Sequence, residues 1–287
     1  MVQRFYRINI LDIRTAKNVA KYSKNFSAED IINFMEASLK SKYDLCFSDG
    51  KKLFILVNIF PLLPLESIGV DSSIYKKCAY IQIIGKLDKE NISKLQNTLK
   101  DLSKKKGISY FFTYANCRNS LLENIGFENT TEIFKMVVPT KLFNNKVPSK
   151  IKTNKIKFKR ATFNDVKRAN LIVKNEMPKW YNRLFFEFFL CPGGFFVAKK
   201  GDEICGFATM RLFNGKKSKW GYGVYTFIKE KFRRKGLARI LERLYSDYAY
   251  KKHVKFIYTH APYCALLFNI KTGWKILKEE KIFILKI

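Results

Sequence analysis

An internal repeat constrains the fold of this 287-residue chain more than any other feature. Residues 105–115 (KKGISYFFTYA) align with residues 251–261 (KKHVKFIYTHA). Each segment has the basic end of a helix, then an aromatic β-strand that finishes on alanine. A short Leu-rich helix, a Gly-aromatic pair and a last strand follow in both copies, the pairs being Gly126-Phe127 and Gly273-Trp274. The repeat predicts two tandem copies of one α/β unit.

A polar, basic and aperiodic stretch at residues 140–155 indicates a linker between the copies. We therefore expect one domain at residues 1–139 and a second at residues 156–287, sizes that are ordinary for domains. The chain is 47% hydrophobic and 15% aromatic, which excludes a disordered protein.

The second copy alternates strands and helices after a hairpin. We expect helices at residues 164–175 (with Asn164 as N-cap), 180–190, 236–250 and 263–271. We expect strands at residues 157–161, 195–199, 204–211, 219–228, 255–259 and 281–287. This order predicts a mixed α+β fold in which a mostly antiparallel central sheet is flanked by helices.

A basic turn joins the predicted strand that ends at Ile228 to the helix that follows. The first N–H groups of such a helix lack intrahelical partners and, with the helix dipole, attract an anion. Gly236 and Ala238 would let a phosphate approach the backbone. Arg233, with Arg234 and Lys235, would neutralise it. The alternative is a solvated, basic helix start without a ligand.

This turn resembles the pyrophosphate-binding turn of the GNAT superfamily of acyl-CoA N-acyltransferases. In that family an Arg or Gln is followed by two residues, a Gly, one residue, and a Gly or Ala, as in Arg233, Gly236 and Ala238 here. The element order of residues 155–287 resembles the same fold, as does a helix that carries Ala265 and closes on a Gly-aromatic pair. The resemblance implies an N-acetyltransferase that uses acetyl-CoA as co-substrate, with the amine attacking the thioester directly.

The resemblance also implies where coenzyme A binds. The strand end would pair with the pantetheine amides, as a sheet edge pairs with a peptide, and a backbone N–H there would polarise the thioester carbonyl. The residues expected to bind the cofactor are Phe227, Ile228, Arg233, Arg234, Lys235, Gly236, Leu237, Ala238, Arg239 and Asn269.

The expected catalytic groups depart from the family pattern. A Tyr four residues before the Gly commonly protonates the leaving thiolate, and Asn269 stands at that position. An Asn can hydrogen-bond sulfur but cannot give up a proton. The strand before the turn also lacks the carboxylate often found there. Asn269, Tyr222 and Tyr263 are our catalytic candidates, and Tyr225, Tyr258, Glu187 and His260 could substitute. Aromatic packing is the alternative role for each tyrosine, and a solvent-exposed or capping role is the alternative for His260.

The first copy lacks the features that an anion needs. In the register of the repeat, Leu87, Glu90 and Ile92 replace Arg233, Gly236 and Ala238. Glu90 would repel a pyrophosphate and Ile92 would block the backbone. We expect this copy to stabilise the other, shape the acceptor cleft or bind a partner.

The formal charge of +31 is concentrated in the second half, where residues 151–287 carry 31 Lys and Arg against 10 Asp and Glu. Such a field attracts polyanions, so a nucleic acid or an acidic protein is a possible partner. The alternative is a compositional bias that keeps the protein soluble. These features leave a second function open, a non-catalytic GNAT scaffold that binds nucleic acid or an acidic protein.

The remaining composition limits other classes. The six cysteines are scattered and there are two histidines, so we expect free thiols rather than a zinc site. No apolar run reaches about 18 residues, and the N-terminus lacks the apolar core of a signal peptide, so we expect a cytoplasmic protein without a membrane span.

Overall fold

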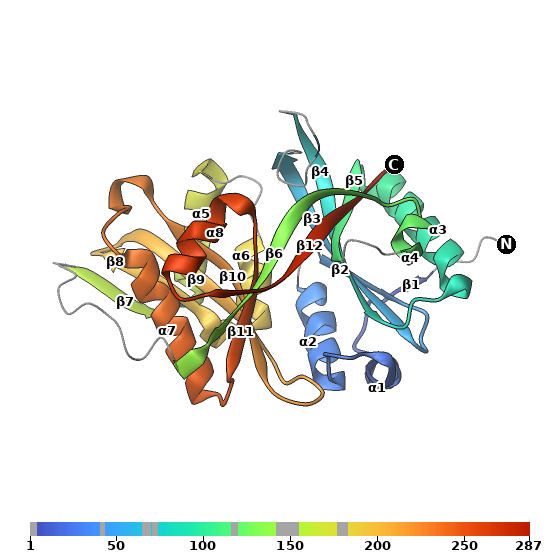
Figure 1. The fold of residues 1–287 in the computed structure, drawn as a ribbon, viewed down its shortest axis with the longest axis horizontal. Coiled ribbons are helices and arrows are strands. Elements are labelled where there is room, and N and C mark those ends of the chain that lie inside the picture. Colours follow the sequence, from blue (N-terminus) through green and yellow to red (C-terminus); the bar gives the residue numbers. More distant parts are fainter. Residues whose placement is uncertain are drawn as a thin grey trace. The chain divides into compact units, whose positions relative to one another are not determined.

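The computed structural model describes residues 5–40, 44–64, 70, 74–115, 120–141, 155–176 and 183–287 (Figure 1). The chain forms two compact units. Unit 1 comprises Met1–Ile133 and Glu279–Ile287, and unit 2 comprises Phe134–Lys278. Among the helices described, none is long and apolar enough to span a membrane.

Unit 1 is a six-stranded mixed sheet with helices. Its elements are β1 (Tyr6–Arg7), α1 (Ile13–Tyr22), α2 (Ala28–Leu39), β2 (Asp44–Ser48), β3 (Leu53–Pro64), β4 (Tyr75–Gly85), α3 (Lys89–Lys106), β5 (Tyr110–Ala115) and α4 (Ser120–Glu123). The strand order is β1-β2-β3-β4-β5-β12, where β12 is Lys275–Lys286. Only β4 and β5 are parallel among the pairs in this order.

Unit 2 repeats this architecture. Its elements are β7 (Ile156–Arg160), α5 (Phe163–Glu176), α6 (Arg183–Leu190), β8 (Phe195–Lys200), β9 (Glu203–Phe213), β10 (Trp220–Ile228), α7 (Leu237–Lys251), β11 (Phe256–Ala261) and α8 (Tyr263–Lys271). The strand order is β6-β11-β10-β9-β8-β7, where β6 is Glu128–Pro139. Here β10 and β11 are the parallel pair.

Both halves of the chain thus run strand, two helices, three strands, helix, strand, helix, strand. This identity of order confirms the predicted repeat, and the mixed, mostly antiparallel sheets confirm the predicted fold class. Leu95 and Leu241, which the alignment made equivalent, are both fully buried on the helix after the third of these strands.

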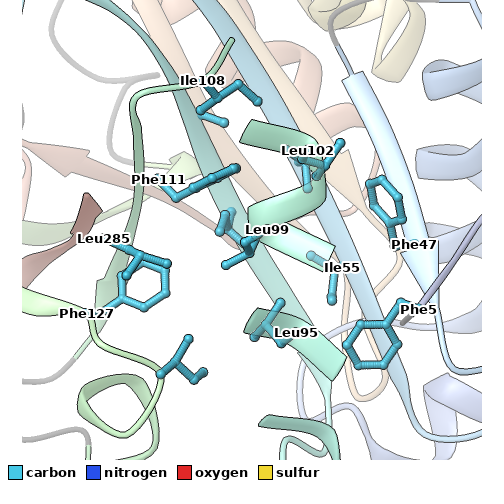
Figure 2. Packing of buried hydrophobic residues seen from close by; sticks show 14 of the residues in the cluster. Phe5, Phe47, Ile55, Leu95, Leu99, Leu102, Ile108, Phe111, Phe127 and Leu285 are labelled. Atoms are coloured by element: carbon cyan, nitrogen blue, oxygen red, sulfur yellow. The ribbon is translucent and has the colours of Figure 1, made fainter. Parts of the chain in front are cut away.

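The core of unit 1 is built where α3 packs on the sheet. Leu95, Leu99 and Leu102 lie along one face of α3 and belong to a buried apolar cluster (Figure 2). Phe283 and Leu285, from the C-terminal strand β12, belong to the same cluster. Residues more than 180 positions apart in the sequence therefore share one core.

The last strand of each copy completes the sheet of the other copy. Residues 134–139 of β6 pair antiparallel with β11 of unit 2, and residues 281–286 of β12 pair with β5 of unit 1. Met136 and Val138 are fully buried in the unit 2 core. The expected boundaries at 1–139 and 156–287 therefore differ from the compact units. Two similar strands can cover either open sheet edge, and sequence alone does not assign them.

Most predicted elements of the second copy lie within two residues of those observed, but two details are wrong. The N-cap of α5 is Thr162, not Asn164: the Thr162 hydroxyl accepts from the Asp165 N–H at 3.2 Å, and the Asp165 carboxylate accepts from the Thr162 N–H at 3.0 Å. This is a capping box. Strand β12 begins at Lys275 rather than at residue 281.

Other expectations fall partly outside the description. Residues 142–154 of the expected linker and residues 177–182 before α6 are not described. The prediction of free thiols is confirmed for Cys46, Cys78, Cys191 and Cys205, which are free and buried.

Candidate active site

Strands β10 and β11 separate in the middle of the unit 2 sheet. They pair in parallel at Gly221↔Ile257 and Tyr222↔Tyr258, and their ladder ends there. On its other side β10 stays paired with β9 as far as Ile228, with a bulge between Gly223 and Tyr225. The β10 backbone beyond the bulge therefore has one edge that no strand pairs with, among the residues described.

A cavity of about 340 Å³ lies where the two strands diverge. Its wall is formed by residues 223–227 of β10, residues 259–261 of β11 and side chains from α7 and α8. Val173, Leu184 and Phe207 line it from the other elements of the unit. The volume lies within the range of small-molecule pockets.

The turn between β10 and α7 has a backbone suited to an anion. Gly236 precedes α7 with φ of 75°, and no described side chain caps the helix. Arg234 also has a positive φ, 61°, which is unfavourable for a residue with a side chain and is often found at functional sites. The first N–H groups of α7 thus stay available at the positive end of the helix dipole.

The basic side chains predicted to surround the anion are close to this turn. Residues 233–236 are exposed. Arg233 Nε donates to the Ile228 carbonyl at 3.1 Å, and Lys235 Nζ donates to the Lys231 carbonyl at 3.2 Å. Arg239 Nη2 donates to the Lys271 carbonyl at 3.4 Å, at the end of α8. Each contact uses one of several donors, so the cations retain others for a ligand.

Unit 1 fills the corresponding helix start with its own carboxylate. Asp88 caps α3 and accepts from the Asn91 N–H at 3.3 Å, while its other oxygen lies 2.6 Å from Lys52 Nζ. The bond from Lys52, with that from Asn91, holds the pKa of Asp88 below its ordinary value. The N-cap of α3 is therefore Asp88, and Glu90, which the sequence register aligned with Gly236, is the second residue of the helix. This geometry supports the prediction that unit 1 holds no pyrophosphate.

Tyr222 and His260 form a polar pair at the point where the strands part. The Tyr222 hydroxyl oxygen lies 2.9 Å from His260 Nδ1, and His260 lines the cavity. Tyr258 instead packs its ring edge-on against Trp220, with 6.0 Å between centroids. Tyr225 lines the cavity, and the side chain of Tyr263 lies outside the description.

Glu187 is held in a buried ion pair and is not a free base. Arg211 Nε donates to Glu187 Oε2 at 2.6 Å, and Nη2 donates to Oε1. Burial alone would lower the pKa of Arg211, but the Glu187 carboxylate raises it, so the guanidinium stays charged. The pair joins α6 to β9.

Asn269, which stands where the GNAT pattern commonly has a Tyr, also lines the cavity. Its Nδ2 donates to the Met136 sulfur at 3.6 Å, so the exchanged strand β6 helps to orient it.

Sequence reasoning missed Glu242, a buried carboxyl on α7 that lines the same cavity. Burial raises its pKa to about 7, while the nearby Thr226 hydroxyl and Trp274 indole oppose the rise. One signal was available: an acid stands between Leu241 and Tyr245 on the apolar face of a predicted amphipathic helix.

Residues 160–265 match the model of the acetyltransferase (GNAT) family. This segment of the chain is therefore similar to GNAT acetyltransferases. The match runs from the end of β7 into α8, so the GNAT segment includes the turn, both diverging strands and most of the cavity wall.

Solved structures extend the likeness to the whole chain. A tandem GNAT protein of the clavulanic acid biosynthesis pathway superposes with a TM-score of 0.64 at 10% identity, covering 99% of this chain and 98% of that one. N-myristoyltransferase of Saccharomyces cerevisiae, with bound myristoyl-CoA, superposes with a TM-score of 0.62 at 13% sequence identity. The match covers 100% of this chain and 80% of that one.

The glucosamine N-acetyltransferase region of a fungal multi-domain β-N-acetylglucosaminidase gives a TM-score of 0.62 at 14% identity; the match covers 98% of this chain and 37% of that one. At these identities the likenesses concern the fold. No curated protein matches this chain in sequence.

Proposed function

We propose that unit 2 is an acyl-CoA-dependent N-acyltransferase that transfers a short acyl group, in the simplest case acetyl, to an amine. One observation carries the proposal. An uncapped helix start at Gly236 adjoins the end of an unpaired strand edge, and that edge leads through a cavity to the Tyr222–His260 pair.

The residues present fit coenzyme A. A phosphate needs backbone N–H groups without a side chain in the way, and Gly236 with Leu237 and Ala238 provides them. Exposed Arg234 and Lys235 supply charge. The unpaired edge of β10 offers N–H and C=O groups to an extended amide chain, which is how a sheet edge binds a peptide.

The remaining residues suit proton transfer. Bound acyl-CoA would supply an activated thioester to the neutral amine. The Tyr222–His260 pair accepts the amine's proton, directly or through a water, because an imidazole is the side chain best matched to neutral pH. Asn269 donates a hydrogen bond toward the departing sulfur but keeps its protons.

The test has two stages with the intact chain. Calorimetry with coenzyme A and acetyl-CoA should show binding at one site per chain. Release of the coenzyme A thiol from acetyl-CoA should then depend on an added amine. The amines to be screened are small free amines, peptides with a free N-terminus and peptides that contain lysine. A wild-type protein that binds neither ligand would rule the proposal out.

The charge supports a second candidate, a GNAT scaffold that binds a polyanion. Residues 151–287 carry an excess of Lys and Arg over Asp and Glu, and the basic residues 233–235 among them are exposed. Gel shifts with RNA and DNA over a salt series should show binding that weakens steeply with salt. Failure to shift either nucleic acid at low salt would dismiss this candidate.

A further inference from the structure

Two buried polar atoms in the cavity wall have no hydrogen-bond partner among the described residues. They are Oε2 of Glu242 and Nε1 of Trp274. Each residue is 3% exposed, and both line the cavity between β10 and β11. The second carboxyl oxygen, Oε1, accepts from the Thr226 hydroxyl at 3.3 Å.

Glu242 and Trp274 lie close to each other in the cavity wall. The Trp274 N–H is near enough to Glu242 to oppose the burial that raises the carboxyl's pKa, yet neither Nε1 nor Oε2 has a hydrogen-bond partner among the described residues. An unsatisfied buried polar group is costly, and a leucine at position 242 would avoid the cost on this face of α7. The Thr226 hydroxyl satisfies Oε1 only, so a ligand group that reaches Oε2 would remove the remaining cost.

The chemistry of the pair selects the ligand group. The indole N–H only donates, and the Glu242 carboxyl oxygens only accept when the group is ionised. A single hydroxyl can satisfy both because it donates one hydrogen bond and accepts another. An ammonium could not accept from Trp274, and a methyl group could do neither.

The position in the cavity relates the pair to the acyl group. The phosphate turn follows the Ile228 end of β10, so a thioester held along this strand directs its acyl end toward Gly223. A Cβ at Gly223 would lie 3.5 Å from Trp274 Cη2 and 3.5 Å from the Tyr245 hydroxyl. The absence of a side chain at this glycine leaves room beside the indole.

We propose that Glu242 and Trp274 form a subsite for the hydroxyl of a short hydroxyacyl group carried by coenzyme A. The inference rests on the proposed function, since it names the acyl class that the same site prefers. Glu242 and Trp274 are specificity-determining residues, and the hydroxyl supplies the partners that both atoms lack.

The experiment measures binding without an acceptor amine. Calorimetry with the intact chain compares coenzyme A, butanoyl-CoA and 3-hydroxybutanoyl-CoA. The hydroxyacyl thioester should bind roughly 10- to 100-fold more tightly than the butanoyl thioester, because the latter leaves both polar atoms unpaired. Free coenzyme A reports on the phosphate turn and strand edge alone.

Two variants remove the subsite independently. Glu242→Leu deletes the acceptor and Trp274→Phe deletes the N–H, and each should abolish the preference while affinity for free coenzyme A stays within twofold. The matched control is Thr209→Val, because the Thr209 hydroxyl is also buried without a described partner but lies outside the cavity wall. This control should keep the full preference.

The outcomes separate the two proposals. Equal binding of both thioesters by the wild type would overturn the hydroxyl subsite and leave the acyltransferase standing. Equal weakening of all three ligands by Glu242→Leu and Trp274→Phe would also overturn it, since the pair would then hold the pantetheine amides. Absence of binding by any ligand would overturn the subsite together with the acyltransferase.

Discussion

The hydroxyl of Tyr222 on β10 and Nδ1 of His260 on β11 lie 2.9 Å apart where the two parallel strands part. Tyr222 belongs to the last paired position of the ladder, and His260 is the second residue beyond its partner Tyr258. The sheet itself therefore holds the pair, and the divergence of the strands gives it access to the cavity.

Tyr222→Phe should lower kcat by about 100-fold, because it removes the hydroxyl that positions or relays the proton. Affinity for acetyl-CoA should not change. Tyr258→Phe is the matched control, since that ring packs against Trp220. Steady-state kinetics with calorimetry would check both, and full turnover by Tyr222→Phe would contradict the assignment.

Gly236→Glu should abolish measurable acetyl-CoA binding, because the new carboxylate repels phosphate and its side chain obstructs the helix start. The substitution should also lower stability, because Gly236 has a positive φ of 75° that a residue with a side chain rarely adopts. Gly201→Glu controls for this, since Gly201 has φ of 58° and open space in the β8–β9 turn. Both variants should lose similar stability, but only Gly236→Glu should lose binding in calorimetry.

Glu242→Gln should change how stability depends on pH. The folded-state pKa of Glu242, about 7, lies above the ordinary 4.5, so the folded protein holds this proton more tightly and loses stability as pH rises between these values. Glutamine cannot ionise. The variant should therefore gain up to about 3 kcal/mol relative to wild type between pH 4 and pH 8 in urea unfolding.

A control with the opposite sign exists. Bonds from Lys231 and Lys229 lower the pKa of Glu203, so its contribution is present at neutral pH and is lost in acid. Glu203→Gln should be slightly less stable than wild type at pH 7 and should equal it at low pH. A Glu242→Gln difference that does not vary with pH would show that the carboxyl titrates normally.

Removing one partner of the Arg211–Glu187 pair should cost about 3–5 kcal/mol, because the other charge stays buried. Arg211→Met and Glu187→Leu together should recover most of this loss. Denaturant unfolding in a double-mutant cycle gives the coupling. If the single variants unfold like wild type, the pair is more solvated than its burial indicates.

The strand exchange predicts which unit each terminal strand stabilises. Met136→Ala should destabilise unit 2 by about 2–4 kcal/mol although Met136 precedes the linker. All three tryptophans (180, 220 and 274) lie in unit 2, so tryptophan fluorescence reports on that unit. Phe283→Ala is the counterpart, because Phe283 lies in the unit 1 core.

The fluorescence transition should shift for Met136→Ala and the circular dichroism transition should shift for both variants. An unchanged fluorescence transition in Met136→Ala would contradict the pairing of β6 with β11.

Local patterns predicted the elements well because periodicity and turn chemistry are local properties. The change from an apolar strand to helical spacing at Gly236 placed β10, the turn and α7 within two residues. The N-cap of α5 was misplaced because Asn164 and Thr162 are both good caps, and only the reciprocal bonds to Asp165 decide between them.

The candidate site was predicted unevenly for the same reason. The phosphate turn is contiguous in sequence, whereas the cavity collects groups from β10, β11, α7 and α8. Glu187 could be proposed as a base only while its partner Arg211, 24 residues away, was unknown. Glu242 was overlooked although it stands between Leu241 and Tyr245 on the apolar face of the helix, because only packing against the sheet shows that this acid is buried.

The sequence by itself determined the repeat, the order of elements and the basic turn, since each depends on residues that are neighbours along the chain. The tertiary structure decided which sheet each terminal strand completes, how β10 and β11 diverge, and which polar atoms lack partners in the cavity between them. These features depend on packing and hydrogen bonds between distant residues, which compete for the same sheet edges and the same buried space.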